Sequence, residues 1–263
     1  MTQSMLLKKS FPYGLKSMKK PYRLFCFHHA GGSVVIFNKW RSYSPSVDVI
    51  PVEIPGRGNR MEESCITDFE TLIKQTSAAL AGAYDGRPFF IYGHSLGAAV
   101  AFETACALQR IYNIKPQKLI VAGRHAPMDP DCSDYRCSMG LEALKKDLLH
   151  LGMMDQDTLE DETFQQFFLP MIYKDYQLHE DYQYQGGRLD IPVIAMNGKS
   201  DDTADADQMD RWALVTDEGF TRYEFEGGHF FPYEESENEV LQRILIETKM
   251  DRKQTESAAY ANV

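Results

Sequence analysis

The sequence predicts one α/β domain built on a mostly parallel, doubly wound sheet, and three observations predict it. The 263 residues allow one large domain or two small ones, and either would bury a substantial core. Apolar runs of strand length are nearly continuous, as in strands that are covered on both faces. Helical patterns lie between these runs, and strands that alternate with helices imply a parallel sheet. We therefore favour a single domain with an insertion.

Six runs have the length and the apolar composition of strands. They lie at Tyr22–Phe27, Val47–Ile54, Phe89–Tyr92, Lys118–Ala122, Ile191–Met196 and Phe220–Phe225. Helical patterns lie at about Val34–Tyr43, Thr67–Tyr84, Ser95–Tyr112, Asp207–Thr216 and Glu237–Met250. Together they assign the domain to about residues 21–250.

One stretch, from about residue 133 to 187, lacks a convincing strand and predicts a helical lid. Its apolar residues recur at helical spacing, which is how a helix buries one face. They are Leu141, Leu144, Leu148 and Leu151, then Phe164, Phe167, Phe168 and Met171. Two alternatives stay open: these residues pack onto the sheet, or they cover a catalytic mouth.

The two ends carry little pattern. Residues 1–20 contain an apolar stretch too short and interrupted for a signal peptide or a membrane span, so we expect a disordered leader. The polar residues 251–263 are expected to form a disordered tail.

The charge indicates which partners to expect, and the cysteines indicate the compartment. The formal charge is −10, from 38 acidic and 28 basic residues, and no dense basic block with interleaved aromatics occurs, which argues against a nucleic-acid partner. The five cysteines are odd in number and form no Cys-x-x-Cys pair, which is typical of reduced cytosolic thiols. No metal-ligand spacing is recognisable among the His and Asp residues, so we expect no metal.

The most informative motif is Gly93-His94-Ser95-Leu96-Gly97, which follows an apolar run and enters a helical pattern. Strand, sharp turn and helix form a nucleophile elbow, with Ser95 at its tip. The flanking glycines allow a strained turn to raise the hydroxyl above the sheet while the helix packs close beneath it. Ser95 is therefore the candidate nucleophile.

A serine hydroxyl needs a base to take its proton and an acid to orient that base. In this topology both lie downstream, with the acid first. His229 follows the last predicted strand and two glycines, so it is the candidate base. Asp201 is preferred as the acid, and its neighbour Asp202 is the alternative. A merely structural role for His229 is the competing interpretation.

The negative oxygen of a tetrahedral intermediate needs two backbone N–H donors. One is expected from Leu96, the residue after the nucleophile. The other is expected from Ala30, in the glycine-containing loop His29-Ala30-Gly31-Gly32 that leaves the first strand. An ordinary glycine-rich turn is the alternative for this loop.

Five motifs in one order resemble the type II thioesterases, the stand-alone editing hydrolases of nonribosomal peptide and polyketide assembly lines, within the α/β-hydrolase superfamily. The resemblance covers about residues 22–250. Its motifs are the oxyanion loop at residues 29–32, Pro-Gly-Arg-Gly at 55–58, the elbow at 93–97, Gly-x-x-Asp at 198–201 and Gly-Gly-His-Phe-Phe at 227–231.

The resemblance implies the α/β-hydrolase fold, the triad Ser95, Asp201 and His229, and an oxyanion hole from Ala30 and Leu96. It also suggests substrate-binding roles for His29, Arg57, Phe168, Tyr173 and Phe230. Two interpretations of Arg57 stay open: it orients the mouth of the site, or it binds carbonyls of its own loop, and we favour the second. The sequence departs from the family at His28, where proline is usual, and at Leu169–Asp175, where Tyr173 and Lys174 replace the usual arginine and alanine.

The function implied is hydrolysis of stalled or aberrant acyl groups from phosphopantetheine arms of carrier proteins. Phosphopantetheine then belongs to the substrate, so no cofactor is expected. The resemblance implies transient carrier-protein partners. We also expect a monomer, a cytoplasmic location, as the cysteines indicate, and no membrane contact, because no apolar stretch is long enough. Two alternatives remain: a medium-chain acyl-carrier or acyl-CoA thioesterase or a carboxylesterase on the same fold, and a non-catalytic binding module.

Overall fold

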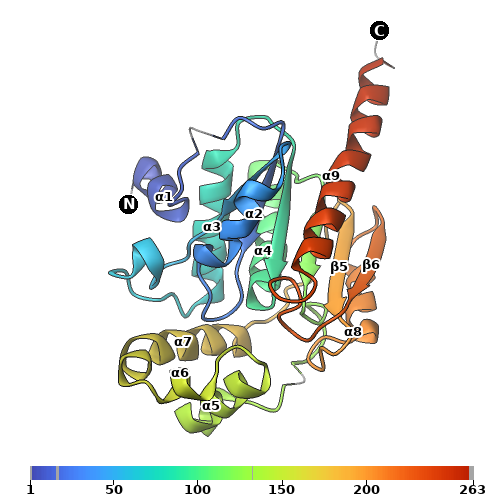
Figure 1. The fold of residues 1–263 in the computed structure, drawn as a ribbon. Helices are drawn as coiled ribbons and strands as arrows, with labels where there is room; N and C mark the ends of the chain where they lie inside the picture. The colour runs from blue at the N-terminus through green and yellow to red at the C-terminus, as the bar shows by residue number, and fades with distance from the viewer. Residues whose placement is uncertain (1, 16–17, 132, 261–263) are drawn as a thin grey trace.

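The computed structural model describes residues 2–15, 18–131 and 133–260, with side chains up to residue 248. Its centre is a six-stranded sheet in the order β2-β1-β3-β4-β5-β6, and every neighbouring pair is parallel (Figure 1). The strands are β1 (Tyr22–Phe27), β2 (Val47–Pro51), β3 (Phe89–His94), β4 (Leu119–Ala122), β5 (Val193–Gly198) and β6 (Phe220–Phe225). The predicted parallel α/β architecture is confirmed.

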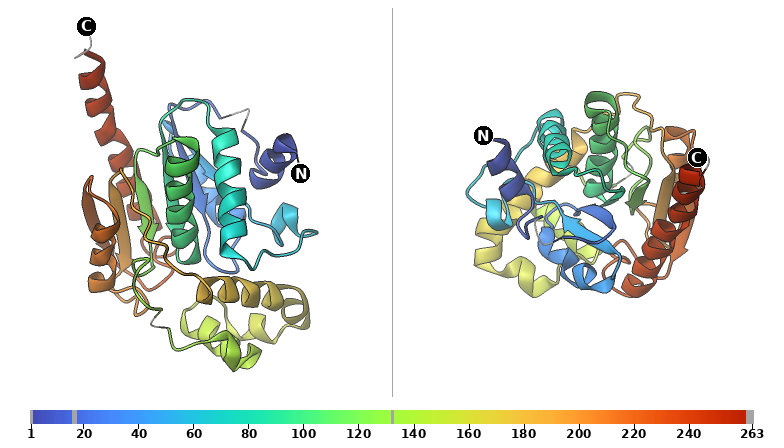
Figure 2. Two further views of the ribbon diagram at one scale, coloured as in Figure 1. Left: turned by 180° about the vertical axis from the view of Figure 1, so that it is seen from behind. Right: turned by 90° about the horizontal axis from the view of Figure 1, so that it is seen from above.

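Helices cover both faces of this sheet, as Figures 1 and 2 show. The helices that precede or flank the strands are α1 (Gln3–Ser10), α2 (Asn38–Tyr43), α3 (Phe69–Ala83), α4 (Leu96–Ala107), α8 (Ala206–Asp210) and α9 (Glu237–Tyr260). Short 3₁₀ or π turns are η1 (Val34–Phe37), η2 (Gly58–Arg60), η3 (Leu108–Tyr112) and η6 (Arg211–Val215).

Alternation along each strand divides the core into two layers. Phe25, Ile91 and Val121 face a cluster with α1, α3 and α4. Their neighbours Leu24 and Ile120 face a second cluster with α2 and α9. Because successive strand side chains point to opposite faces, a continuous apolar run serves both layers at once.

The insertion between β4 and β5 has its own small core. It contains η4 (Cys137–Met139), α5 (Leu141–His150), α6 (Gln156–Glu160), η5 (Phe164–Phe168) and α7 (Leu169–Glu180). Leu144, Leu148, Phe164 and Ile172 pack in a cluster separate from the two layers of the sheet. The lid lies below the sheet in Figure 1. Its buried apolar residues pack against one another in their own cluster.

The expected disordered leader is wrong over the residues that the structure describes there. Residues 3–10 form α1, with Thr2 capping its first turn through Met5 N. Leu6 and Phe11 are buried in the core layer beside α3, and Gln3 Nε2 donates to Ala78 O. The short apolar stretch is thus the inward face of an amphipathic helix. Residues 1, 16 and 17 lie outside the described part.

Where the sequence predicts a disordered tail, the structure draws residues 251–260 as a continuation of α9 (Figure 1). This stretch contains neither glycine nor proline, so nothing in its sequence ends the helix. Residues 261–263 lie outside the described part. Among the described residues, no helix has an apolar run that would carry it across a bilayer.

Candidate active site

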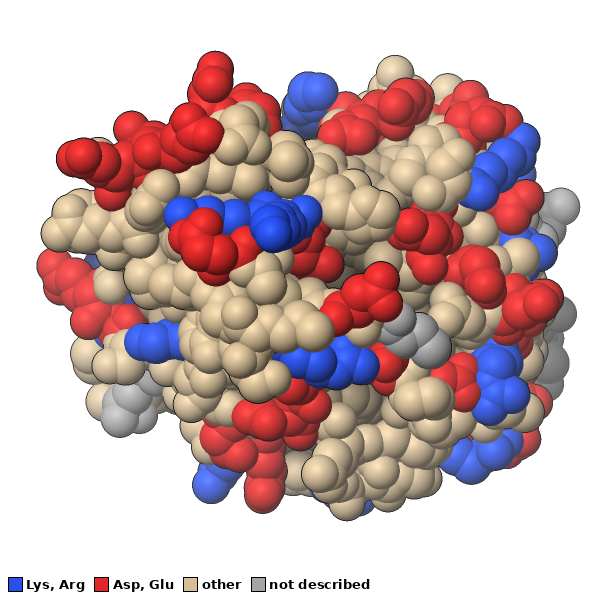
Figure 3. Space-filling model, turned by 90° about the horizontal axis from the view of Figure 1, so that it is seen from below, with Lys and Arg blue, Asp and Glu red and all other residues tan. Residues whose placement is uncertain are grey.

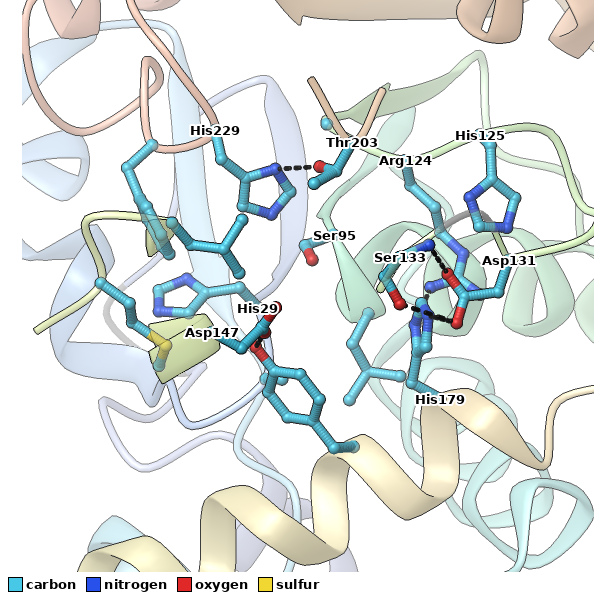
Figure 4. Close-up of a pocket in the computed structure, with 17 residues that line it drawn as sticks. His29, Ser95, Arg124, His125, Asp131, Ser133, Asp147, His179, Thr203 and His229 are labelled. Atoms are coloured by element: carbon cyan, nitrogen blue, oxygen red, sulfur yellow. Dashed lines mark hydrogen bonds and ion pairs between the residues drawn. The ribbon is translucent and has the colours of Figure 1, made fainter. Parts of the chain in front are cut away.

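Ser95 sits on the sharp turn between β3 and α4. Its backbone has φ 55° and ψ −121°, a conformation that residues with a side chain seldom adopt. The turn is crowded: a Cβ on Gly97 would lie 2.4 Å from Phe27 O, and one on Gly93 would lie 2.1 Å from Gly97 O. Both glycines are therefore required by close backbone approach. The strained turn holds the Ser95 hydroxyl at the cavity (Figure 4).

His229 and Asp201 come from loops after the two neighbouring strands β6 and β5. His229 Nδ1 lies 3.0 Å from Asp201 Oδ2. An ionised carboxylate only accepts, so Nδ1 carries the hydrogen and Nε2 is available to accept a proton. The His229 ring projects into the cavity that Ser95 also lines (Figure 4). The structure thus brings the three predicted side chains to one place.

Thr203 adds a contact that the sequence analysis did not include. Its hydroxyl donates to Asp201 Oδ1 at 2.7 Å, and its oxygen lies 3.0 Å from His229 Nδ1. Burial alone would raise the pKa of Asp201, but hydrogen bonds from His229 and Thr203 outweigh it and lower that pKa to about 2. Asp201 therefore stays ionised at neutral pH.

The alternative acid points elsewhere. Asp202 is exposed, and its carboxylate lies 3.1 Å from His150 Nε2 on the lid helix α5. His94, which precedes the nucleophile, is fully buried, and its Nε2 contacts His229 O at 2.8 Å. The structure therefore places Asp201, and not Asp202, against the imidazole.

Ala30 and Leu96, the predicted oxyanion donors, both line the cavity beside Ser95. Leu96 is the first residue of α4, so its N–H has no acceptor within the helix and lies at the positive end of the helix dipole. Ala30 lies in the loop after β1, directly before Gly31, whose φ is 73°. Both residues that the sequence predicts as oxyanion donors therefore lie at the cavity that Ser95 lines.

This loop is fastened to the lid by a buried carboxylate. Asp175 of α7, which is 1% exposed, accepts from Gly31 N at 2.7 Å. Arg57 donates to both oxygens of Asp175, at 2.5 and 2.7 Å, and to Gly32 O at 3.3 Å. Arg57 thus connects the loop after β1 with the lid, which fits a role in orienting the mouth of the site. None of these side-chain contacts is with a carbonyl of its own loop.

The remaining predicted substrate contacts divide into two groups. His29 and Phe230 line the cavity, with ring centroids 4.9 Å apart. Tyr173 lies outside this cavity, where its hydroxyl donates to Cys137 O at 3.2 Å. Phe168 is also outside it and stacks on Phe164. Neither residue lines this cavity, so a substrate-binding role for Tyr173 and Phe168 stays a prediction.

The cavity and the open space at its mouth together span about 720 Å³. Its lining includes the apolar residues Leu151, Met153 and Phe230. One end carries a group of polar residues from the loop after β4 and from α7, which sequence reasoning missed: Arg124, His125, Asp131, Ser133 and His179 (Figure 4). No periodic pattern in the sequence marks these residues, because they are brought together only when the chain folds. A nucleophile, a base and two amide donors around such a cavity can carry out acyl transfer to water.

A sheet of this topology with a nucleophile elbow defines an α/β-hydrolase-type enzyme. The model of the thioesterase domain family matches residues 22–247, so the chain belongs to the thioesterase domain family and is a hydrolase that acts on thioesters.

Similar proteins are found in sequence and in structure. Linear gramicidin dehydrogenase LgrE from Brevibacillus parabrevis is 35% identical, over 86% of each chain. Thioesterase PikA5 from Streptomyces venezuelae is 32% identical, over 85% of this chain and 81% of that protein. YbtT, described as a type II thioesterase from the yersiniabactin NRPS/PKS pathway, is a solved structure with a TM-score of 0.76 and 25% identity, over 89% of this chain and 92% of its own.

Proposed function

We propose that this protein hydrolyses acyl groups from the phosphopantetheine arms of carrier proteins in nonribosomal peptide or polyketide biosynthesis. The similarity to YbtT and PikA5 supports this substrate class. The observation that carries the chemistry is the hydrogen bond between His229 and the buried Asp201, at the cavity that Ser95 lines.

In the proposed reaction, His229 Nε2 takes the proton of Ser95, whose oxygen attacks the thioester carbonyl. The amides of Ala30 and Leu96 stabilise the negative oxygen of the tetrahedral intermediate. Asp201 keeps the imidazole in the required tautomer and stabilises the imidazolium. The thiol then leaves with the proton, and an acyl group remains on Ser95.

Water completes the cycle. His229 accepts a proton from a water molecule that attacks the acyl-Ser95 ester, and the free acid leaves while Ser95 regains its hydrogen. A thiolate is a better leaving group than an alkoxide or an amine, so the first step needs little help. The proposal uses no cofactor or metal, and it places the reaction in the cytoplasm, on a monomer.

Recognition of an acidic carrier by a chain of charge −10 needs a local surface, because long-range attraction is weak. We assign this docking to the lid side, with Lys145, Lys146 and Lys174 as contacts. In Figure 3, which views the lid end, basic side chains lie scattered among acidic ones. Lys145 is already paired with Glu142 at 2.8 Å, so we expect Lys146 and Lys174 to make most of the contacts with the carrier.

The test is a hydrolysis panel in which the same acyl groups are carried by a carrier protein, by CoA and by a truncated pantetheine mimic. The proposal predicts the highest kcat/KM on the carrier protein. Lys146→Glu with Lys174→Glu should lower kcat/KM several-fold on the carrier and spare the mimic. A preference for acyl-CoA or for oxygen esters would instead support the medium-chain thioesterase or carboxylesterase alternative.

A further inference from the structure

The polar end of the cavity has no role in the reaction described above. It is formed by the loop that follows β4 and by α7 of the lid, and it lies across the cavity from His229 (Figure 4). A saturated alkyl chain that covered this end would offer no acceptor to its remaining donors, which would lose their water without gaining a partner.

Arg124 is the central residue of this end. It is 5% exposed, and its backbone oxygen accepts from Trp212 Nε1 at 2.7 Å, which fixes its position. Its guanidinium donates to His179 Nδ1 and lies 5.5 Å from the ring centroid of Tyr182. Burial lowers the pKa of Arg124 to about 10, so it remains charged at neutral pH. Within the described part of the chain, no carboxylate pairs directly with it at 4 Å or less.

The nearest carboxylate is already occupied. Asp131 accepts from Ser133 N at 3.0 Å and from Ser133 Oγ at 3.1 Å. Arg136 Nη1 lies 3.3 Å from it, and His179 Nε2 lies 3.4 Å from it. These contacts engage both oxygens of Asp131. The carboxylate raises the pKa of Arg124 through its charge, against the larger effect of burial, but its direct contacts are with Ser133, Arg136 and His179.

The two ring nitrogens of His179 then have defined roles. Arginine can only donate, so Nδ1 accepts from Arg124 and the hydrogen sits on Nε2, which faces Asp131. Burial and the charge of Arg124 lower the pKa of His179, which keeps the ring neutral. Asp131, His179 and Arg124 thus form a chain that holds a charged donor at the cavity wall.

A saturated acyl chain that covered this wall would leave its donors without acceptors, which costs on the order of 1–3 kcal/mol per buried group. An acyl chain with a carbonyl or carboxylate oxygen would accept from them instead. We propose that Arg124 and its neighbours bind an acceptor oxygen of the acyl group, so that the enzyme prefers oxygenated acyl chains over saturated ones. This inference rests on the proposed function and specifies its substrate class.

The experiment compares acyl groups matched in length on one pantetheine mimic: butanoyl with 3-oxobutanoyl and with 3-carboxypropanoyl, and hexanoyl with 5-oxohexanoyl. Each kcat/KM of the wild type is divided by the hydroxide-catalysed rate of the same thioester, which removes differences in intrinsic reactivity. We expect at least one oxygenated member to exceed its saturated partner by about tenfold or more. Equal normalised values throughout the panel would overturn the inference.

Arg124→Met tests whether the preference resides at this wall, and Arg124→Lys is the matched variant that keeps the charge without the planar donor set. We expect Arg124→Met to abolish the ratio between partners, with Arg124→Lys intermediate. A folding defect lowers both partners equally, so an unchanged ratio in Arg124→Met would contradict the assignment. If Arg124→Met does not fold, His179→Ala gives the same readout through the loss of Arg124 positioning.

The outcomes separate this inference from the proposed function. A wild type that hydrolyses none of these thioesters, free or on a carrier, contradicts the proposed function. A wild type that hydrolyses them all with no preference contradicts only the inference.

Discussion

The two sides of Ser95 are held in place in different ways. On the acid–base side, Asp201, Thr203 and His229 contact one another across loops that follow the adjacent strands β5 and β6. On the oxyanion side, the loop after β1 is held by Asp175, a residue of the lid.

Proton transfer and stabilisation of the negative oxygen therefore depend on different parts of the molecule. The acid–base contacts belong to the sheet, so they form whenever the sheet forms. The oxyanion loop depends on a residue 144 positions away in an insertion with its own core. We therefore expect changes in the lid to impair stabilisation of the transition state, and to leave the Asp201–His229 pair intact.

The largest effect is expected from Ser95→Ala, because it removes the nucleophile that both sides serve. Hydrolysis of carrier-bound acyl groups should fall by roughly 10⁴-fold or more. A fluorophosphonate probe should label the wild type and not the variant. Retained hydrolysis in Ser95→Ala would contradict the assignment and would favour direct attack by water.

The acid–base side is tested next by Asp201→Asn, which keeps the shape of the side chain and removes its charge. We expect kcat to fall by roughly 10³- to 10⁴-fold, because the imidazole loses its required tautomer. Asp202→Asn is the matched control and should change kcat by less than about threefold, since Asp202 contacts only His150 among the described residues. A larger loss in the control would reverse the choice of acid.

The oxyanion side is tested by Asp175→Asn. The amide oxygen can still accept from Gly31, but the ion pair with Arg57 is lost, and breaking a buried pair costs about 3–5 kcal/mol of stability. Assayed well below the unfolding midpoint, kcat should fall by about 10- to 100-fold with little change in KM. A rise in KM at constant kcat would instead show that the contact serves ground-state binding.

A smaller effect is expected from a change at Glu53, which lies beside the loop that contains Arg57. A Cβ on Gly58 would lie 2.1 Å from its Oε2, and burial raises its pKa to about 7 despite the nearby Arg57. His28 lies 3.8 Å away, but burial lowers the pKa of His28 to about 4, so the two do not form an ion pair at neutral pH.

Glu53 therefore makes stability depend on pH. The unfolded carboxyl ionises above about pH 4.3 while the folded one keeps its proton to about pH 7, so stability falls as pH rises through this window. Relative to wild type, Glu53→Gln should gain about 2–3 kcal/mol between pH 5 and pH 8, measured by urea unfolding. An equal difference at both pH values would contradict the raised pKa.

The acid–base side of the site could be predicted from the sequence. The nucleophile elbow, the acid loop and the final histidine loop are local patterns at strand ends, and chain order alone brings them together. Thr203 stood two residues after the preferred acid, in a position where a hydroxyl commonly binds a nearby carboxylate, so it could have been found.

Other parts depended on the tertiary structure. The contact between Arg57 and Asp175 spans 118 positions, and no local spacing encodes it. The convergence of Arg124 and His179 at the cavity depends on how the lid folds over the sheet. The helix α1 also depends on the tertiary structure, because its few apolar residues are stabilised by packing against α3.

The most direct test of the central claim is to detect the acyl group on Ser95. Carrier protein loaded with an acyl group is mixed with the enzyme and quenched rapidly, and the peptide that contains Ser95 is analysed by mass spectrometry. The account predicts a peptide heavier by one acyl group, which appears before the free acid and is absent from Ser95→Ala. Free acid that accumulates while this peptide is never acylated would contradict it.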